Sequence, residues 1–196
     1  MLTDPNSAQH SNIFQVYFTR MHRDSDFSFM LEGLVRLLSN PVQSNNTYLP
    51  GSRKRIRFSS ELVLFVWRLV DLNKRFMSFL LQDSRLMDLV MPILACAIEA
   101  GEDDSQVGLV HVVAFLLLIL SGERNFGVRL NRPFTEHFPG FPRAEASNAD
   151  VLIFAIHKLI VHGKKVLFQL YECLLTIIAN AAPFVKSMSS SSAQKL

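Results

Sequence analysis

The sequence predicts an all-α protein built from antiparallel helix pairs, as in a segment of an armadillo- or HEAT-like α-solenoid. Apolar residues recur every three or four positions along most of the chain, which is the spacing of a helical face. No stretch shows strand-like alternation, and no glycine-rich nucleotide loop occurs. Two successive helix pairs are each about 30 to 50 residues long, the length of one solenoid repeat. Since no internal sequence repeat is visible, a compact helical bundle is the alternative.

The first two helices precede a polar loop. A helix is predicted over residues 11–21, where apolar side chains form one helical face: Ile13, Phe14, Tyr17, Phe18 and Met21. The next helix begins near Ser25 or Asp26, either of which can cap it. It ends at Pro41, because proline cannot continue the helical hydrogen bonding. A loop is expected near residues 40–58, which are rich in Asn, Ser, Pro and Gly.

Serines are the expected caps of the following helices. Ser59 or Ser60 is predicted to cap one helix, and residues 76–81 continue it or form a short second turn. Ser84 is expected to open a further helix, and Gly101 is a natural signal for its C-terminus. This part of the chain therefore predicts two or three helices.

The most apolar stretch runs from Val107 to Leu120. Its uninterrupted core begins only at Val112, so it is far shorter than the ~20 apolar residues that a bilayer-crossing helix needs. No interfacial Trp or Tyr follows it. A helix that is apolar on all sides but too short to span a membrane is typically buried inside a helical protein. The alternative is an integral membrane protein in which this stretch is embedded.

The last third of the chain predicts a loop and two helices. Residues 131–146 contain three prolines and one glycine and are expected to form a loop. Ser147 and Asp150 match a capping box, which opens a helix that ends at Gly163. A final helix covers residues 166–182.

Composition indicates one helical domain with excess apolar surface. We expect this domain over residues 11–186, between a disordered N-terminus at residues 1–10 and a Ser-rich disordered tail at residues 187–196. The chain is 49% apolar and only 19% charged, below the ~25% of an average domain. It therefore either contacts a membrane or belongs to a larger helical array. The net charge of +3 and the lack of basic residues interleaved with aromatics argue against nucleic-acid binding.

No catalytic, cofactor, metal or small-molecule site is predicted. The chain contains neither HExxH nor GxSxG. His157 and His162 are five positions apart and so lie on diverging helix faces, while His111 is expected to be a hydrogen-bonded core histidine. Cys96 and Cys173 lie in apolar helical runs, which is typical of small packing residues in a reducing, cytosolic protein.

A polar turn follows the most apolar stretch. It consists of Ser121, Gly122, Glu123, Arg124, Asn125, Phe126 and Gly127. Glu123 and Arg124 could be a catalytic acid and an electrostatic clamp, but a capping and packing turn is the favoured interpretation. In that interpretation Arg124 and Arg129 bind helix-end carbonyls. Asn125 or Gly127 takes a left-handed backbone conformation, and the phenylalanine fills a pocket.

Long stretches of the sequence resemble one known family. They are YFTRMHRDSDF and RLLSNP in the first two helices, VGLVHVVAFLLLILSGERNFGVRLNRPF in the middle, and ADVLIFAIHKLI and CLLTIIANAAPFVKS near the end. On these stretches the chain is identified as a member of the high-temperature-induced dauer-formation protein family, which is related to the dymeclins. The resemblance covers roughly residues 13–188.

The resemblance implies a non-enzymatic role. Members of this family are longer, so the chain is expected to be an internal segment or a partial gene product. They resemble peripheral α-helical proteins of the Golgi and trans-Golgi network that sort cargo into dense-core vesicles, with other secretory-pathway proteins and the cytosolic membrane face as partners. No catalytic residues are transferred. Members often begin with a myristoylated glycine, whereas Leu2 follows Met1 in this chain, so that anchor does not carry over.

The one compact basic run is the candidate patch for an acidic lipid or partner: Arg53, Lys54, Arg55 and Arg57. Each such residue contributes ~1 kcal/mol of attraction near an anionic membrane, which is too little for stable anchoring without a second signal. Replacing all four by Ser should therefore weaken cosedimentation with anionic liposomes at low salt. Equal binding by the replaced and unchanged chains would exclude the patch.

Overall fold

The computed structural model describes residues 12–45, 56–135, 146–161, 163 and 165–195. Their only β feature is an isolated antiparallel bridge between Pro133 and Ser147. The α-helices of these residues are α1 (Ile13–Arg20), α2 (Asp24–Asn45), α3 (Ser59–Leu72), α4 (Lys74–Gln82), α5 (Leu86–Gly101), α6 (Val107–Ser121), α7 (Arg124–Arg129), α8 (Asn148–Val161), α9 (Tyr171–Ala181) and α10 (Ser190–Ala193). Short 3-10 helices are η1 (Asp104–Gln106), η2 (Lys165–Leu170) and η3 (Ala182–Phe184). The all-α prediction is confirmed.

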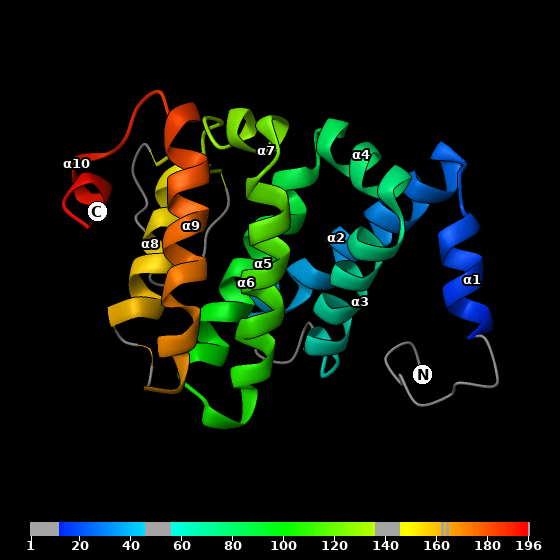
Figure 1. The fold of residues 1–196 in the computed structure, drawn as a ribbon, viewed down its shortest axis with the longest axis horizontal. Helices are drawn as coiled ribbons and strands as arrows, with labels where there is room; N and C mark the ends of the chain where they lie inside the picture. The colour runs from blue at the N-terminus through cyan, green and yellow to red at the C-terminus, as the bar shows by residue number, and fades with distance from the viewer. Residues whose placement is uncertain (1–11, 46–55, 136–145, 162, 164, 196) are drawn as a thin grey trace.

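Six of the helices lie in two rows of three. In one row α2 contacts α5 and α5 contacts α8, while in the other α3 contacts α6 and α6 contacts α9. The rows are joined in pairs, because α2 contacts α3, α5 contacts α6 and α8 contacts α9. Figure 1 shows α1 at one end of this array and α10 at the other. These are the contacts of stacked helix pairs, and the narrower armadillo or HEAT assignment stays a prediction.

The core is centred on α5 and α6. Of the 16 residues of α5, 13 are buried, because α2, α6 and α8 all pack against it. Helix α6 packs against α3, α5 and α9. Its buried residues share one broad face of the helix: Leu109, Val110, Val113, Ala114, Leu116, Leu117, Leu120 and Ser121. The three neighbours cover this face, and the other apolar side chains of α6 are half-buried or, at Phe115, exposed.

Helix α2 extends past the predicted stop. It continues through Pro41 to Asn45, whereas the sequence predicted an end at the proline. Proline removes one helical hydrogen bond, but Leu38 and Pro41 are both buried. Burial of Leu38 and Pro41 therefore offsets the missing bond.

The predicted serine caps are wrong for α3 and α5. The N-cap position of α3 is Phe58, which makes no side-chain cap hydrogen bond. Helix α5 begins after Arg85, whose backbone N–H donates to Oδ1 of Asp83 at 2.8 Å. This carboxylate is held in place by the Arg85 side chain, with 2.7 Å between Nη2 and Oδ2, so it is a stronger acceptor than the Ser84 hydroxyl.

Asn73 separates α3 from α4 and ties both to α1. Its Oδ1 accepts hydrogen bonds from the backbone N–H groups of Arg75 and Phe76, each at 3.0 Å. Its Nδ2 donates to the backbone oxygens of Phe18 at 2.7 Å and Met21 at 2.9 Å. Residues 76–81 thus belong to a separate helix, and this buried amide fixes the end of α1.

The last predicted helix is divided. Residues 166–182 were expected to form one helix, but η2 precedes α9. Leu167 and Leu170 are both buried, and residues three apart share one face of a 3-10 helix. The tighter helix therefore directs both leucines into the core.

Asp150 connects the start of α8 to the C-terminal segment. The predicted capping box forms, since the Ser147 N–H donates to Oδ2 of Asp150 at 2.8 Å and the Asp150 N–H donates to Oγ of Ser147 at 3.3 Å. Oδ1 of Asp150 accepts from the Ser189 N–H at 2.9 Å. Ser192 is buried in the following α10. The described part of the Ser-rich tail, predicted to be disordered, is thus held against α8.

Protonation of Asp150 should destabilise the fold. Burial alone would raise the pKa of Asp150, but donation from the backbone N–H groups of Ser147 and Ser189 and from nearby hydroxyls outweighs it and lowers the pKa to about 2. Since this value lies below the ~4 of an unfolded aspartate, the carboxylate stabilises the fold above pH ~4, and this contribution is lost as the pH falls toward ~2.

Asp150→Asn should therefore lower the free energy of unfolding at pH 7 by about 2 kcal/mol and flatten its decline below pH ~4. Denaturant titrations at neutral and acidic pH measure both effects. Asp24→Asn, at the exposed start of α2, is the control. Equal acid sensitivity of the parent chain and Asp150→Asn would contradict this role.

Candidate functional site

The polar turn after α6 makes packing contacts. Ser121 is buried, and its Oγ donates to the backbone oxygen of Leu118 at 3.0 Å and accepts from Nδ2 of Asn180 at 3.1 Å. This second bond joins the end of α6 to α9. Glu123 and Arg124 are exposed. The turn therefore closes one helix of the central pair and leads into α7.

Phe126 and Gly127 fix α7 to the core. Phe126 is fully buried. A left-handed backbone was expected at Asn125 or Gly127, but both lie within α7 (Arg124–Arg129). Gly127 is required for another reason: a Cβ at this position would lie 2.6 Å from Cγ and 2.9 Å from Cβ of Phe184. The backbone of α7 and η3 can approach this closely only without a side chain there.

Arginines from α7 and the residues after it bind the end of α4. Nε of Arg129 donates to the backbone oxygen of Leu81 at 3.1 Å, and its Nη2 donates to that of Gln82. Nη1 of Arg132 donates to the backbone oxygen of Ser84 at 3.1 Å. The expectation that Arg129 binds helix-end carbonyls is thus met on α4, 47 to 48 residues earlier in the chain. No signal within α7 alone could have identified this partner.

Asn131 provides a further connection between distant segments. Its Nδ2 donates to the backbone oxygen of Phe184 at 2.8 Å, and its Oδ1 accepts from the backbone N–H of Lys186 at 2.8 Å. The segment that follows α9, from η3 to Lys186, is therefore attached to the segment after α7.

Three of the four residues of the predicted basic patch lie outside the described residues: Arg53, Lys54 and Arg55. The fourth, Arg57, is exposed just before α3. The role of this patch stays a prediction.

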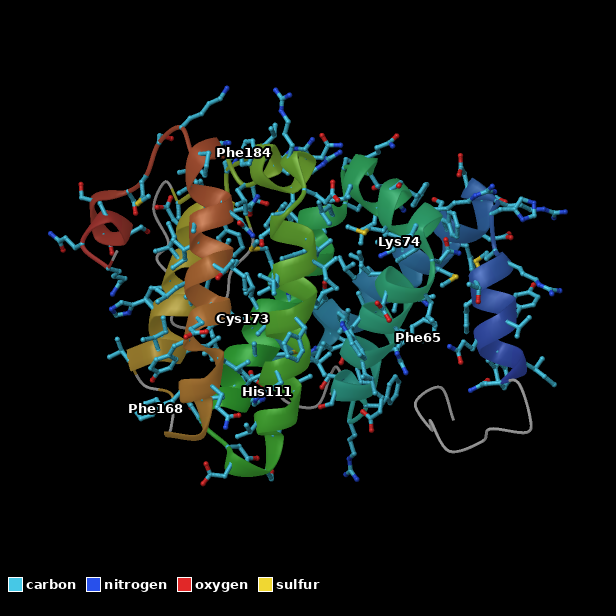
Figure 2. The ribbon with its side chains drawn as sticks, viewed as in Figure 1. Phe65, Lys74, His111, Phe168, Cys173 and Phe184 are labelled. Carbon is cyan, nitrogen blue, oxygen red and sulfur yellow. The ribbon has the colours of Figure 1, made fainter. Side chains whose placement is uncertain are left out.

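The candidate catalytic side chains do not converge. Nδ1 of the half-buried His111 lies 2.9 Å from the backbone oxygen of Val107 on α6, as expected of a core histidine (Figure 2). His162 lies outside the described residues, and His157 is half-buried on α8. Over the part of the chain that is described, no three His, Cys, Asp or Glu side chains could hold a metal ion together.

Both cysteines are thiols that pack in the helical array. Cys96 is buried, and Sγ of Cys173 lies 3.8 Å from the backbone oxygen of Ala114. Burial raises the pKa of the Cys173 thiol. A raised pKa disfavours the thiolate of Cys173, and burial restricts access to Cys96, so neither environment is that of a reactive nucleophile.

Several large apolar side chains are exposed on successive helices. Ile13 of α1 and Phe29 of α2 are 80% and 81% exposed. Phe115 of α6, Phe168 of η2 and Leu175 of α9 are 45%, 56% and 56% exposed. Phe168 lies at the end of α9 opposite to Phe184 (Figure 2). Phe115, Phe168 and Leu175 belong to three elements that contact one another, α6, η2 and α9. Exposed apolar side chains on adjoining elements are candidates for contacts with another molecule.

Two helical stretches of the described chain are long and apolar enough to cross a membrane by length and composition alone. They are Asp104–Ser121 and Leu167–Phe184. Core helices of proteins outside membranes satisfy the same criterion. In the first stretch, the packing of α6 against three helices accounts for the apolar residues of its buried face.

The fold defines a class: an all-helical protein built of stacked helix pairs. The chain belongs to the high-temperature-induced dauer-formation protein (Hid1) family, whose sequence model matches residues 2–196. It is 45% identical over its full length to the proteins named HID1 of mouse and human.

More distant relatives occur outside animals. The chain is 29% identical over 185 residues to HID1 of Dictyostelium discoideum, and 29% identical over 190 residues to the Ubp5-interacting protein ftp105 of Schizosaccharomyces pombe. The alignments cover all of this chain for the mammalian relatives and 94% of it for these two. The chain spans 25% of the mammalian relatives and 20% of the other two. No solved structure matches it.

Gly127→Ala tests the close approach of α7 and η3. The added methyl group would overlap the Phe184 side chain down to its Cβ, so the two backbones must separate. We expect a loss of about 1 to 3 kcal/mol in the free energy of unfolding. Gly108→Ala is the matched control, because a Cβ on this exposed residue of α6 would meet nothing within 4 Å. Equal unfolding midpoints for the two variants in urea would refute the constraint.

Proposed function

We propose that this chain is part of a non-enzymatic scaffold or adaptor that associates peripherally with the cytosolic face of Golgi and trans-Golgi membranes. In this role it acts in secretory trafficking and in sorting cargo into dense-core vesicles, with other secretory-pathway proteins as partners. The names of the family and of its relatives carry no enzymatic activity. The proposal gives the helical array a binding role.

The observation that carries the proposal is the surface of the two-row array. Stacked helix pairs present a continuous surface on each row, and exposed apolar side chains occur on it at Phe115 and Leu175. Such surfaces bind partner proteins without catalysing a reaction. One relative is named as an interacting protein of Ubp5, which supports a role through protein contacts.

The rival proposal is an integral membrane protein with Val107–Leu120 embedded. Embedding would require α6 to leave α3, α5 and α9, all of which pack against it. The apolar side chains of these three helices that pack against α6 would then be exposed to water. Each fully buried Leu or Val side chain contributes ~1.5–3 kcal/mol to folding, so the packing of α6 favours the peripheral role.

Alkaline carbonate extraction of Golgi-enriched membranes that contain the native full-length protein separates the two proposals. Peripheral association predicts release into the supernatant together with a peripheral Golgi marker. An integral Golgi protein, retained in the pellet, is the control. Retention of this protein until detergent is added would overturn the peripheral proposal and favour an embedded α6.

A further inference from the structure

A cavity of about 380 Å³ lies between the end of α4 and the segment that contains α7. Both helices lie along the same edge of the array (Figure 1). The cavity is lined by Leu81, Gln82, Asn125, Val128, Arg129 and Arg132. Two of these side chains are cationic, two are amides and two are apolar, so no carboxylate lines it.

The two arginines are oriented by neutral acceptors. Arg129 is held by the carbonyls of Leu81 and Gln82, and Arg132 is held by the carbonyl of Ser84. A guanidinium has five N–H donors. Two donor atoms of Arg129 and one of Arg132 make these bonds, which leaves N–H groups on both residues for a ligand. These hydrogen bonds to backbone oxygens thus fix the orientation of both guanidinium groups without neutralising their positive charges.

The charges of the two arginines are not balanced within the cavity. Burial lowers the pKa of Arg129 and the charge of Arg132 lowers it further, while the nearby Asp83 carboxylate raises it. The neighbouring carboxylates are Asp83 and Asp88. Asp83 is bound to Arg85 through both oxygens, at 2.9 and 2.7 Å. Burial raises the pKa of Asp88, and the charge of Arg132 lowers it. One carboxylate is therefore committed elsewhere, and an anion in the cavity would relieve the repulsion between the arginines.

We infer that the cavity between Arg129 and Arg132 binds a phosphate group. Phosphate matches two adjacent guanidinium forks because it offers several acceptor oxygens and about two negative charges. The amides of Gln82 and Asn125 can donate to further oxygens of the ligand. The proposal is independent of the Golgi role, since it rests only on this cavity. The phosphate group could belong to a soluble molecule or to a lipid headgroup.

Thermal unfolding of the full chain in inorganic phosphate, compared with chloride at equal ionic strength, tests the site. Phosphate is expected to raise the unfolding midpoint, because a ligand that binds only the folded state stabilises it. Arg132→Gln should abolish the additional shift and weaken phosphate binding about tenfold in calorimetry. Arg124→Gln is the matched control: it removes the same charge from exposed α7, outside the cavity.

Arg132→Lys tests the planar fork while keeping the positive charge. Lysine has a single donor nitrogen in place of the guanidinium fork, so a smaller rise in the unfolding midpoint with phosphate is expected. Arg129 is left unchanged because it also holds α4. An equal midpoint in phosphate and chloride, or an equal loss of the shift in Arg124→Gln and Arg132→Gln, would overturn the proposal.

The source of the phosphate is tested with vesicles. Cosedimentation with phosphatidylcholine vesicles that contain phosphatidylinositol phosphate, abolished by Arg132→Gln and by free phosphate, would identify a lipid headgroup. A phosphate shift without cosedimentation would identify a soluble ligand. Cosedimentation that Arg132→Gln leaves unchanged would exclude this cavity as the lipid site.

Discussion

The structure depends on the packing of the broad buried face of α6 against α3, α5 and α9. This face consists almost entirely of apolar side chains, so it is stable outside a membrane only if other helices cover it. Its neighbour α5 has the same requirement, with 13 of its 16 residues buried. These two helices form the middle pair of the array, and the outer pairs provide their cover. The excess of apolar residues is thus a consequence of stacking.

Polar side chains, some of them buried, join distant segments of the stacked pairs. The bonds of Asn73 to the end of α1 join residues 52 and 55 positions apart. Asn131 reaches Phe184 over 53 positions, and Ser121 meets Asn180 over 59. These separations are close to the length of one helix pair with its connections. Each bond therefore attaches segments that lie far apart in the chain at a fixed position, where apolar packing alone would allow sliding.

The sequence predicts local features well and tertiary ones poorly. Apolar periodicity located the long helices, and the Ser147–Asp150 box formed because both partners lie within one turn. The serine caps of α3 and α5 failed because serine is common in loops as well as at caps. The role of Gly127 depends on Phe184, and that of Arg129 depends on α4. No pattern near either residue encodes such partners, so the cavity between Arg129 and Arg132 could not be predicted from the sequence.

Amide hydrogen exchange of residues 107–121, in the purified chain without lipid or detergent, tests the packing of α6 most directly. Amides that open only with global unfolding exchange the most slowly in a protein. A core α6 should therefore exchange as slowly as α5. Rapid exchange of α6 while α5 stays protected would contradict the account, because α6 would then not be packed between its three neighbours.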